Sequence, residues 1–120
     1  MKLTREQVIA EHRKMWRWIA EQYEKMDCMD CLSPRQLKEI YLCEKGYDFF
    51  LICRSCCFLC EYTGGLECNK CPLDWGVSQD CVGDYKNKGL YRQINQCYWE
   101  GDFKKCAELA HQIAELPEKQ

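Results

Sequence analysis

Residues 56–75 read CCFLCEYTGGLECNKCPLDW, and five of these twenty residues are cysteine. Two residues between cysteines allow a tight turn to aim both sulfurs at one point, and two such turns supply the four thiolates of a tetrahedral zinc site. Gly64 and Gly65, between the two pairs, allow the chain to turn back sharply. The pattern therefore predicts a zinc site with four ligands, Cys57, Cys60, Cys68 and Cys71.

A second zinc site is expected from two further CxxC pairs, whose separation is close to that of a zinc ribbon. The neighbouring cysteines at 56 and 57 would point in different directions on an extended chain, which suits two sites better than one. One or two zinc ions per chain are therefore expected. The ligands of the second site are Cys28, Cys31, Cys53 and Cys56, with Cys43 and Cys81 as competing alternatives.

The wider composition favours metal over disulfides. The chain has 120 residues, enough for one domain with a modest core, and 12 of them are cysteine. Its first residues carry frequent charges without the apolar run of a secretory signal, and the longest apolar run, FFLIC at 49–53, is too short to span a membrane. We therefore expect a cytoplasmic protein, where thiols stay reduced unless a metal binds them.

Other uses of the cysteines remain as alternatives. A disulfide scaffold would also suit an even number of cysteines. An iron-sulfur cluster uses the same thiolates, although only the Cys71-Pro72 step resembles the end of a ferredoxin series. Thiol redox chemistry needs a CxxC pair at the start of a helix that follows a strand, and none of the pairs has that setting clearly.

Helices are expected on both sides of the cysteine-rich segment. Thr4 and Gln7 form a capping box, which predicts the start of a helix over 4–27. Ser33 and Pro34 predict the start of a second helix, which runs to about residue 45, with Gly46 as its left-handed cap. The apolar face of the first helix recurs at spacings of three and four: Val8, Ile9, His12, Met15, Trp16, Ile19, Tyr23 and Met26.

A helical hairpin is predicted over 89–116, with Gly101 ending its first helix and Asp102 capping its second. Cys97 and Cys106 lie on apolar stripes there, so core packing is the favoured role for both. The sequence thus predicts a single, mainly α domain with helices at both ends of a zinc-organised, cysteine-rich middle (28–83) that has little strand. A small α+β arrangement is the alternative.

The sequence favours binding over catalysis. The only histidines, His12 and His111, lie at opposite ends of the chain, and a zinc ion with four cysteines has no open position for chemistry. The first helix carries basic residues, but glutamates interleave with them and the formal net charge is −2, which argues against a general phosphate binder.

Trp18 lies off the apolar stripe, and we expect it to be an exposed anchor for a protein partner. The candidate partner-binding residues are Trp18, Arg13 and Arg17.

Four segments resemble a group of small, cysteine-bearing proteins encoded by bacteriophages and prophages: HRKMWRWIAE (12–21), CFLCEY (57–62), CNKCPLDWG (68–76) and AELAHQIAELP (107–117). The resemblance implies a phage-borne, metal-binding accessory protein in the cytoplasm of a bacterial host, with Cys57, Cys60, Cys68 and Cys71 as the matching ligands. The additional cysteines of this chain depart from the pattern. The leading hypothesis is a zinc-stabilised, non-catalytic protein that binds a host protein, for example as an anti-CRISPR or other anti-defence factor. A nucleic-acid-binding zinc module is the second hypothesis, and an iron-sulfur or thiol redox protein is the third.

Overall fold

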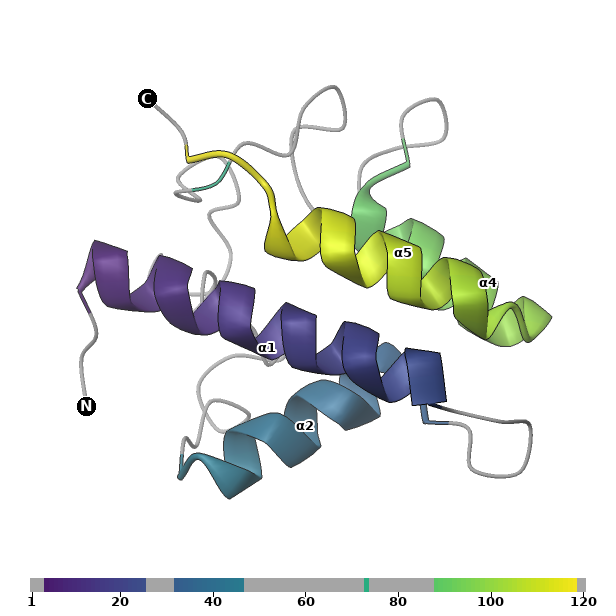
Figure 1. Cartoon of the computed structure of the whole chain (residues 1–120), viewed down its shortest axis with the longest axis horizontal. Coiled ribbons are helices and arrows are strands. Elements are labelled where there is room, and N and C mark those ends of the chain that lie inside the picture. Colours follow the sequence, from purple (N-terminus) through teal and green to yellow (C-terminus); the bar gives the residue numbers. More distant parts are fainter. Residues whose placement is uncertain (1–3, 26–31, 47–72, 74–87, 119–120) are drawn as a thin grey trace.

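The computed structural model describes residues 4–25, 32–46, 73 and 88–118. They form four helices, α1 (Arg5–Lys25), α2 (Pro34–Glu44), α4 (Leu90–Glu100) and α5 (Phe103–Ala114), shown in Figure 1. An isolated antiparallel bridge joins Leu73 to Glu118. The prediction of a mainly α protein is confirmed for this part of the chain. Of the predicted cysteine-rich middle, 28–83, only α2, its flanking residues and Leu73 are described.

Local capping explains where the helices begin. The backbone N–H of Thr4 donates to the Gln7 side chain at 2.9 Å, and the N–H of Gln7 donates to the Thr4 hydroxyl at 3.2 Å, so the predicted capping box is confirmed. Ser33 forms a second capping box with Gln36 at the start of α2. The Asp102 carboxylate accepts from the N–H of Lys105 at 3.2 Å at the start of α5. Each box satisfies backbone donors that a helix start leaves unpaired.

Two glycines end helices as the sequence predicts. Gly46, just beyond α2, has φ +79°, and Gly101, just beyond α4, has φ +78°. Only glycine adopts this left-handed conformation without a steric penalty from a Cβ atom. Gly101 is followed at once by Asp102, the N-cap of α5, so a very short connection joins the two helices into the predicted hairpin.

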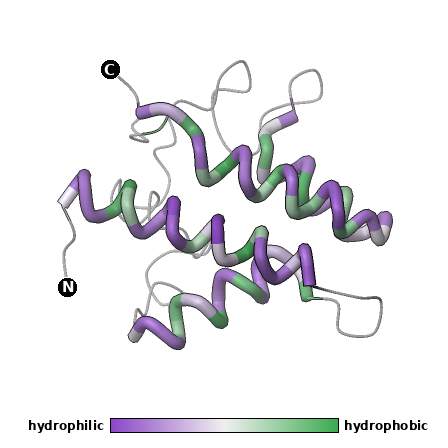
Figure 2. Tube along the Cα trace, in the orientation of Figure 1, coloured by the Kyte–Doolittle hydropathy of each residue, from purple (hydrophilic) through white to green (hydrophobic). Residues whose placement is uncertain are grey.

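The core is organised around α1 and α5, which lie side by side and run in opposite directions (Figure 1). The helices show hydrophobic and hydrophilic residues at helical spacing in Figure 2, and the predicted apolar face of α1 is buried as far as Tyr23. α4 packs against α5, and α2 packs against α1 and α4. The fully buried apolar side chains include Met15, Ile19, Leu42, Leu73, Ile94, Cys106, Ala110 and Ile113.

A lysine joins three of the helices. Lys38 on α2 is only 2 % exposed, and its ammonium lies 3.8 Å from the ring centre of Tyr91 on α4 and 5.4 Å from that of Trp16 on α1. Aromatic faces attract cations electrostatically, most strongly where water is excluded. The sequence interpretation did not place Lys38 in the core, because lysine is ordinarily a surface residue.

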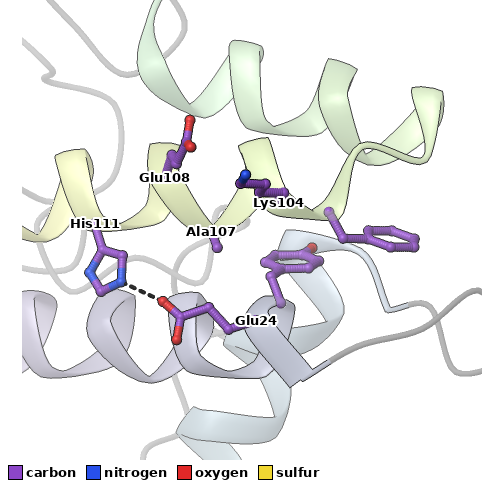
Figure 3. A pocket seen from close by; sticks show the side chains of 7 residues that line it. Glu24, Lys104, Ala107, Glu108 and His111 are labelled. Carbon is purple, nitrogen blue, oxygen red and sulfur yellow. Dashed lines mark hydrogen bonds and ion pairs between the residues drawn. The ribbon is translucent and has the colours of Figure 1, made fainter.

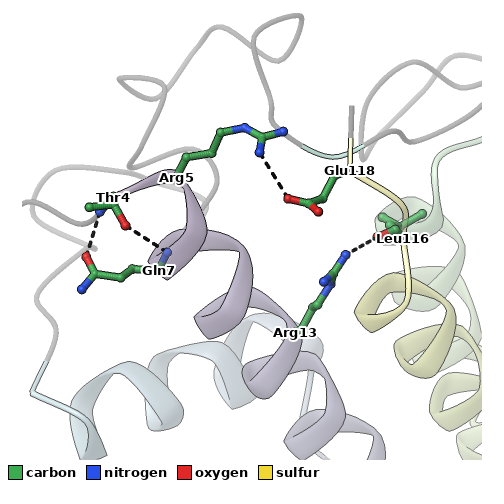
Figure 4. A network of polar contacts seen from close by, with 6 residues as sticks. All are labelled: Thr4, Arg5, Gln7, Arg13, Leu116 and Glu118. Carbon is green, nitrogen blue, oxygen red and sulfur yellow. Dashed lines mark hydrogen bonds and ion pairs between the residues drawn. The ribbon is translucent and has the colours of Figure 1, made fainter. Parts of the chain in front are cut away.

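Side chains of α1 hold the end of α5 in place. The ring nitrogen Nε2 of His12 lies 3.4 Å from the carbonyl oxygen of Ile113, and Arg13 Nη2 donates to the carbonyl oxygen of Leu116 at 3.1 Å. Arg5 also pairs with Glu118 at 3.2 Å, as Figure 4 shows together with the Thr4 and Gln7 cap. The Ile113 carbonyl lies in the last turn of α5, and Leu116 and Glu118 follow just beyond it, so these contacts join α1 to the end of α5 and to the residues after it.

Candidate protein-interaction surface

Most of the predicted metal ligands lie outside the described residues. Among the residues that the structure describes, no three histidine, cysteine or acidic side chains gather as a metal site. Cys43, one of the alternative ligands, is exposed near the end of α2, and its role as a ligand stays a prediction. The predicted ligands outside the described part are Cys28, Cys31, Cys53, Cys56, Cys57, Cys60, Cys68, Cys71 and Cys81.

The two cysteines of the helical hairpin are core residues, as the sequence predicts. Cys106 is fully buried, and its thiol lies 3.7 Å from the carbonyl oxygen of Ile94, to which it donates. Burial raises the pKa of Cys106 from 9.0 to about 12, with smaller contributions from Cys97 and Asp102. Burial also raises the pKa of Cys97. Because metals bind the thiolate, burial disfavours Cys106 as a metal ligand.

The three predicted partner-binding residues differ in their surroundings. Trp18 is half-buried, with its ring centre 5.7 Å from that of Tyr41 on α2, so the expectation that it is exposed is wrong. α2 covers this side chain, which periodicity within α1 alone could not reveal. Arg13 is half-buried and bonded to Leu116, whereas Arg17 is exposed. Of the three, Arg17 is therefore the most accessible.

A different tryptophan is exposed. Trp99, near the end of α4, is 84 % exposed. Among the residues that the structure describes, no other large hydrophobic side chain is exposed to this extent. The sequence interpretation missed it, although Trp99 falls outside the stripe of Leu90, Ile94, Cys97 and Tyr98. Its position outside that apolar stripe is the sequence feature that could have identified Trp99 as exposed.

Trp99 begins a row of four aromatic rings that leads into the molecule. Its ring centre lies 5.9 Å from that of Tyr98, and Tyr98 lies 6.4 Å from Phe103. Phe103 stacks on Tyr23 of α1 at 6.1 Å, with only 10° between the ring planes. Offset and edge-to-face contacts at these distances are favourable. The exposed indole of Trp99 is therefore the outer member of a series of ring contacts. We call these four residues the aromatic row.

The inner end of the aromatic row forms a wall of an open groove of about 440 Å³ between α1 and α5. Figure 3 shows its polar rim, where His111 Nε2 lies 2.8 Å from a carboxylate oxygen of Glu24. His111 is thus a surface residue. The groove is lined by Tyr23, Glu24, Phe103, Lys104, Ala107, Glu108 and His111.

The described helices contain none that is long and apolar enough to cross a membrane. An exposed indole is suited to holding an apolar side chain of another macromolecule, and Tyr98 and Phe103 connect Trp99 to the wall of the groove. Comparison with protein-family models, with curated proteins and with solved structures finds no match for the chain.

Proposed function

We propose that the chain is a zinc-stabilised, non-catalytic protein that acts by binding another protein through the aromatic row. The observation that carries this proposal is Trp99, which is 84 % exposed and yet in ring contact with Tyr98. Tryptophan is enriched among the residues that dominate binding energy, because it offers a large, rigid apolar surface with one hydrogen-bond donor. The Tyr98 ring supports one side of this indole, which leaves most of its surface open to a partner.

The zinc part of the proposal rests on the cysteine pattern. Cys57, Cys60, Cys68 and Cys71 form two CxxC pairs, the donor set of a closed structural zinc site. Such a site organises the chain and has no open position for a reacting water. The resemblance to phage-encoded proteins favours a bacterial host protein as the partner, with a defence component as the favoured class.

The contacts of α1 favour a protein partner over nucleic acid. Three of its five basic side chains are engaged within the molecule: Arg5 with Glu118 at 3.2 Å, Lys14 with Glu11 at 3.7 Å, and Arg13 with the carbonyl of Leu116. Nucleic-acid binding needs cations that are free to replace counterions on phosphates. The formal net charge of −2 adds no general attraction for phosphates.

The test is capture of a stoichiometric partner from a bacterial host lysate by the zinc-loaded, tagged full chain. Trp99→Ala should lose that partner while it keeps the zinc content and the helical circular dichroism of the wild type, because Trp99 contributes little to the core. Gln96→Ala, an exposed position on the same helix, is the matched control and should keep the partner. A partner retained equally by both variants would contradict the role of the aromatic row.

A gel-shift assay with generic DNA and RNA at about 0.15 M salt distinguishes the proposed protein binder from the second hypothesis, a nucleic-acid-binding zinc module. We expect no tight binding. Tight binding that Arg17→Glu abolishes would instead establish the nucleic-acid-binding module and displace the protein-partner proposal.

A further inference from the structure

One face of α5 carries an ordered pattern of charge beside the groove. Phe103, Lys104, Ala107, Glu108 and His111 recur at spacings of three and four, so they share that face, and all five line the groove. Lys104 and Glu108 are exposed and lie one turn apart (Figure 3). Within the part of the chain that the structure describes, neither is in an ion pair. Both charges are therefore available to an incoming surface.

This pattern is complementary to itself. If two copies of α5 lie antiparallel across a twofold axis near Ala107, Lys104 of each copy faces Glu108 of the other, and Phe103 faces His111. A twofold interface uses the same patch on both copies, so one favourable charge pair is made twice. Ala107, near the axis, is 5 % exposed, and its small side chain adds no bulk between the two helices.

We propose that this face of α5 binds a second copy of the chain and forms a twofold-symmetric dimer. The half-buried ring of Phe103 then contacts the His111 ring of the second copy, and the methylene stems of Lys104 cover the groove. Trp99 does not line the groove, so it stays available to another protein. The dimer shares Phe103 with the aromatic row, so Lys104 and Glu108 test the dimer while Trp99 tests the proposed function.

The contact is confined to about two turns of helix and part of α1, so we expect weak association. Stable interfaces bury about 800 Å² on each partner, and smaller ones are typically transient. A dissociation constant in the micromolar range is expected.

Sedimentation equilibrium of the zinc-loaded full chain tests the proposal. Lys104→Glu alone and Glu108→Lys alone should each weaken the dimer at least about tenfold, because each places like charges opposite each other. Mixed in equal amounts, the two variants should form a heterodimer, since one presents two acidic and the other two basic side chains. The double variant with both reversals should regain the wild-type affinity.

Two exposed positions on α1 supply matched controls. Arg17→Glu changes the net charge by the same amount as Lys104→Glu, and Glu21→Lys by the same amount as Glu108→Lys. Both should leave the dimer unchanged. The proposal is overturned by a wild-type chain that stays monomeric up to about 1 mM, by a dimer that the α5 reversals leave intact, or by a mixture of the two single variants that does not associate.

Discussion

The described cysteines show how the surroundings of one residue type set its chemistry. Cys43 is exposed on α2, while Cys106 is fully buried beneath α4 and donates to the Ile94 carbonyl. The sequence distinguishes the exposed cysteine from the buried one in part, because Cys106 lies on an apolar stripe at helical spacing. Burial then holds the Cys106 proton, so this thiol acts as a small apolar side chain with a weak donor.

The raised pKa of Cys106 predicts a loss of stability at alkaline pH. An unfolded chain releases this proton near pH 9.0, whereas the folded chain holds it until about pH 12. The stabilisation is therefore complete below pH 9.0 and falls as pH rises toward 12, because the unfolded state then binds fewer protons than the folded state. Urea unfolding at a series of pH values should show this decline.

Cys106→Ala is the control for that decline. It should cost about 1 kcal/mol of packing at neutral pH, because a sulfur atom is lost from the core. Its stability should fall less steeply than that of the wild type above pH 9.0, since one thiol no longer titrates. Parallel declines in the two proteins would show that burial does not hold the Cys106 proton.

At the scale of the element, helix boundaries follow from local chemistry. The hydroxyl of Thr4, the carboxylate of Asp102 and the left-handed glycines Gly46 and Gly101 all act within a few residues, so their effects could be predicted from the sequence. The end of α5 depends instead on His12 and Arg13, about a hundred residues earlier in the chain. No local pattern in α5 indicates those partners.

Arg13→Ala should destabilise the molecule by about 1 to 2 kcal/mol, because the charge-assisted hydrogen bond to the Leu116 carbonyl, just beyond α5, is lost. Arg17→Ala, one turn further along α1 and exposed, should change stability by less than about 0.5 kcal/mol. Urea unfolding measures both. Hydrogen exchange should also accelerate in the last turn of α5 in Arg13→Ala alone. Equal losses for the two variants would exclude the capping role.

For the whole molecule, the arrangement of the helices could not be predicted from the sequence. Periodicity identifies the buried faces of α1 and α5, but it does not say that these faces meet each other or that α2 covers Trp18. The candidate site could not be predicted for the same reason, because it depends on which helices pack together. Tyr23 and Phe103 are eighty residues apart, and the groove exists only because the antiparallel contact brings α1 and α5 together.

The proposed zinc and the helical core should stabilise one another through Leu73. This residue is fully buried in the core, bridges to Glu118, and follows the predicted ligand Cys71 by two positions. Structural zinc sites contribute about 10 to 16 kcal/mol of apparent binding free energy in small peptides, which is comparable to the stability of a domain. Loss of the metal should therefore release Leu73 and weaken the packing of the helices.

Elemental analysis of the purified chain should find one or two zinc ions bound through sulfur, and Cys68→Ser should lose one of them. That variant should also unfold at lower urea concentration than the wild type, because the segment that carries Leu73 is no longer held. Cys106→Ala, which removes a buried thiol outside the CxxC pairs, should keep all of the zinc.

A metal-free wild type, or a visible iron-sulfur absorption band after anaerobic purification, would contradict zinc. A Cys68→Ser chain that loses zinc without losing stability would show that the metal and the helical core are independent.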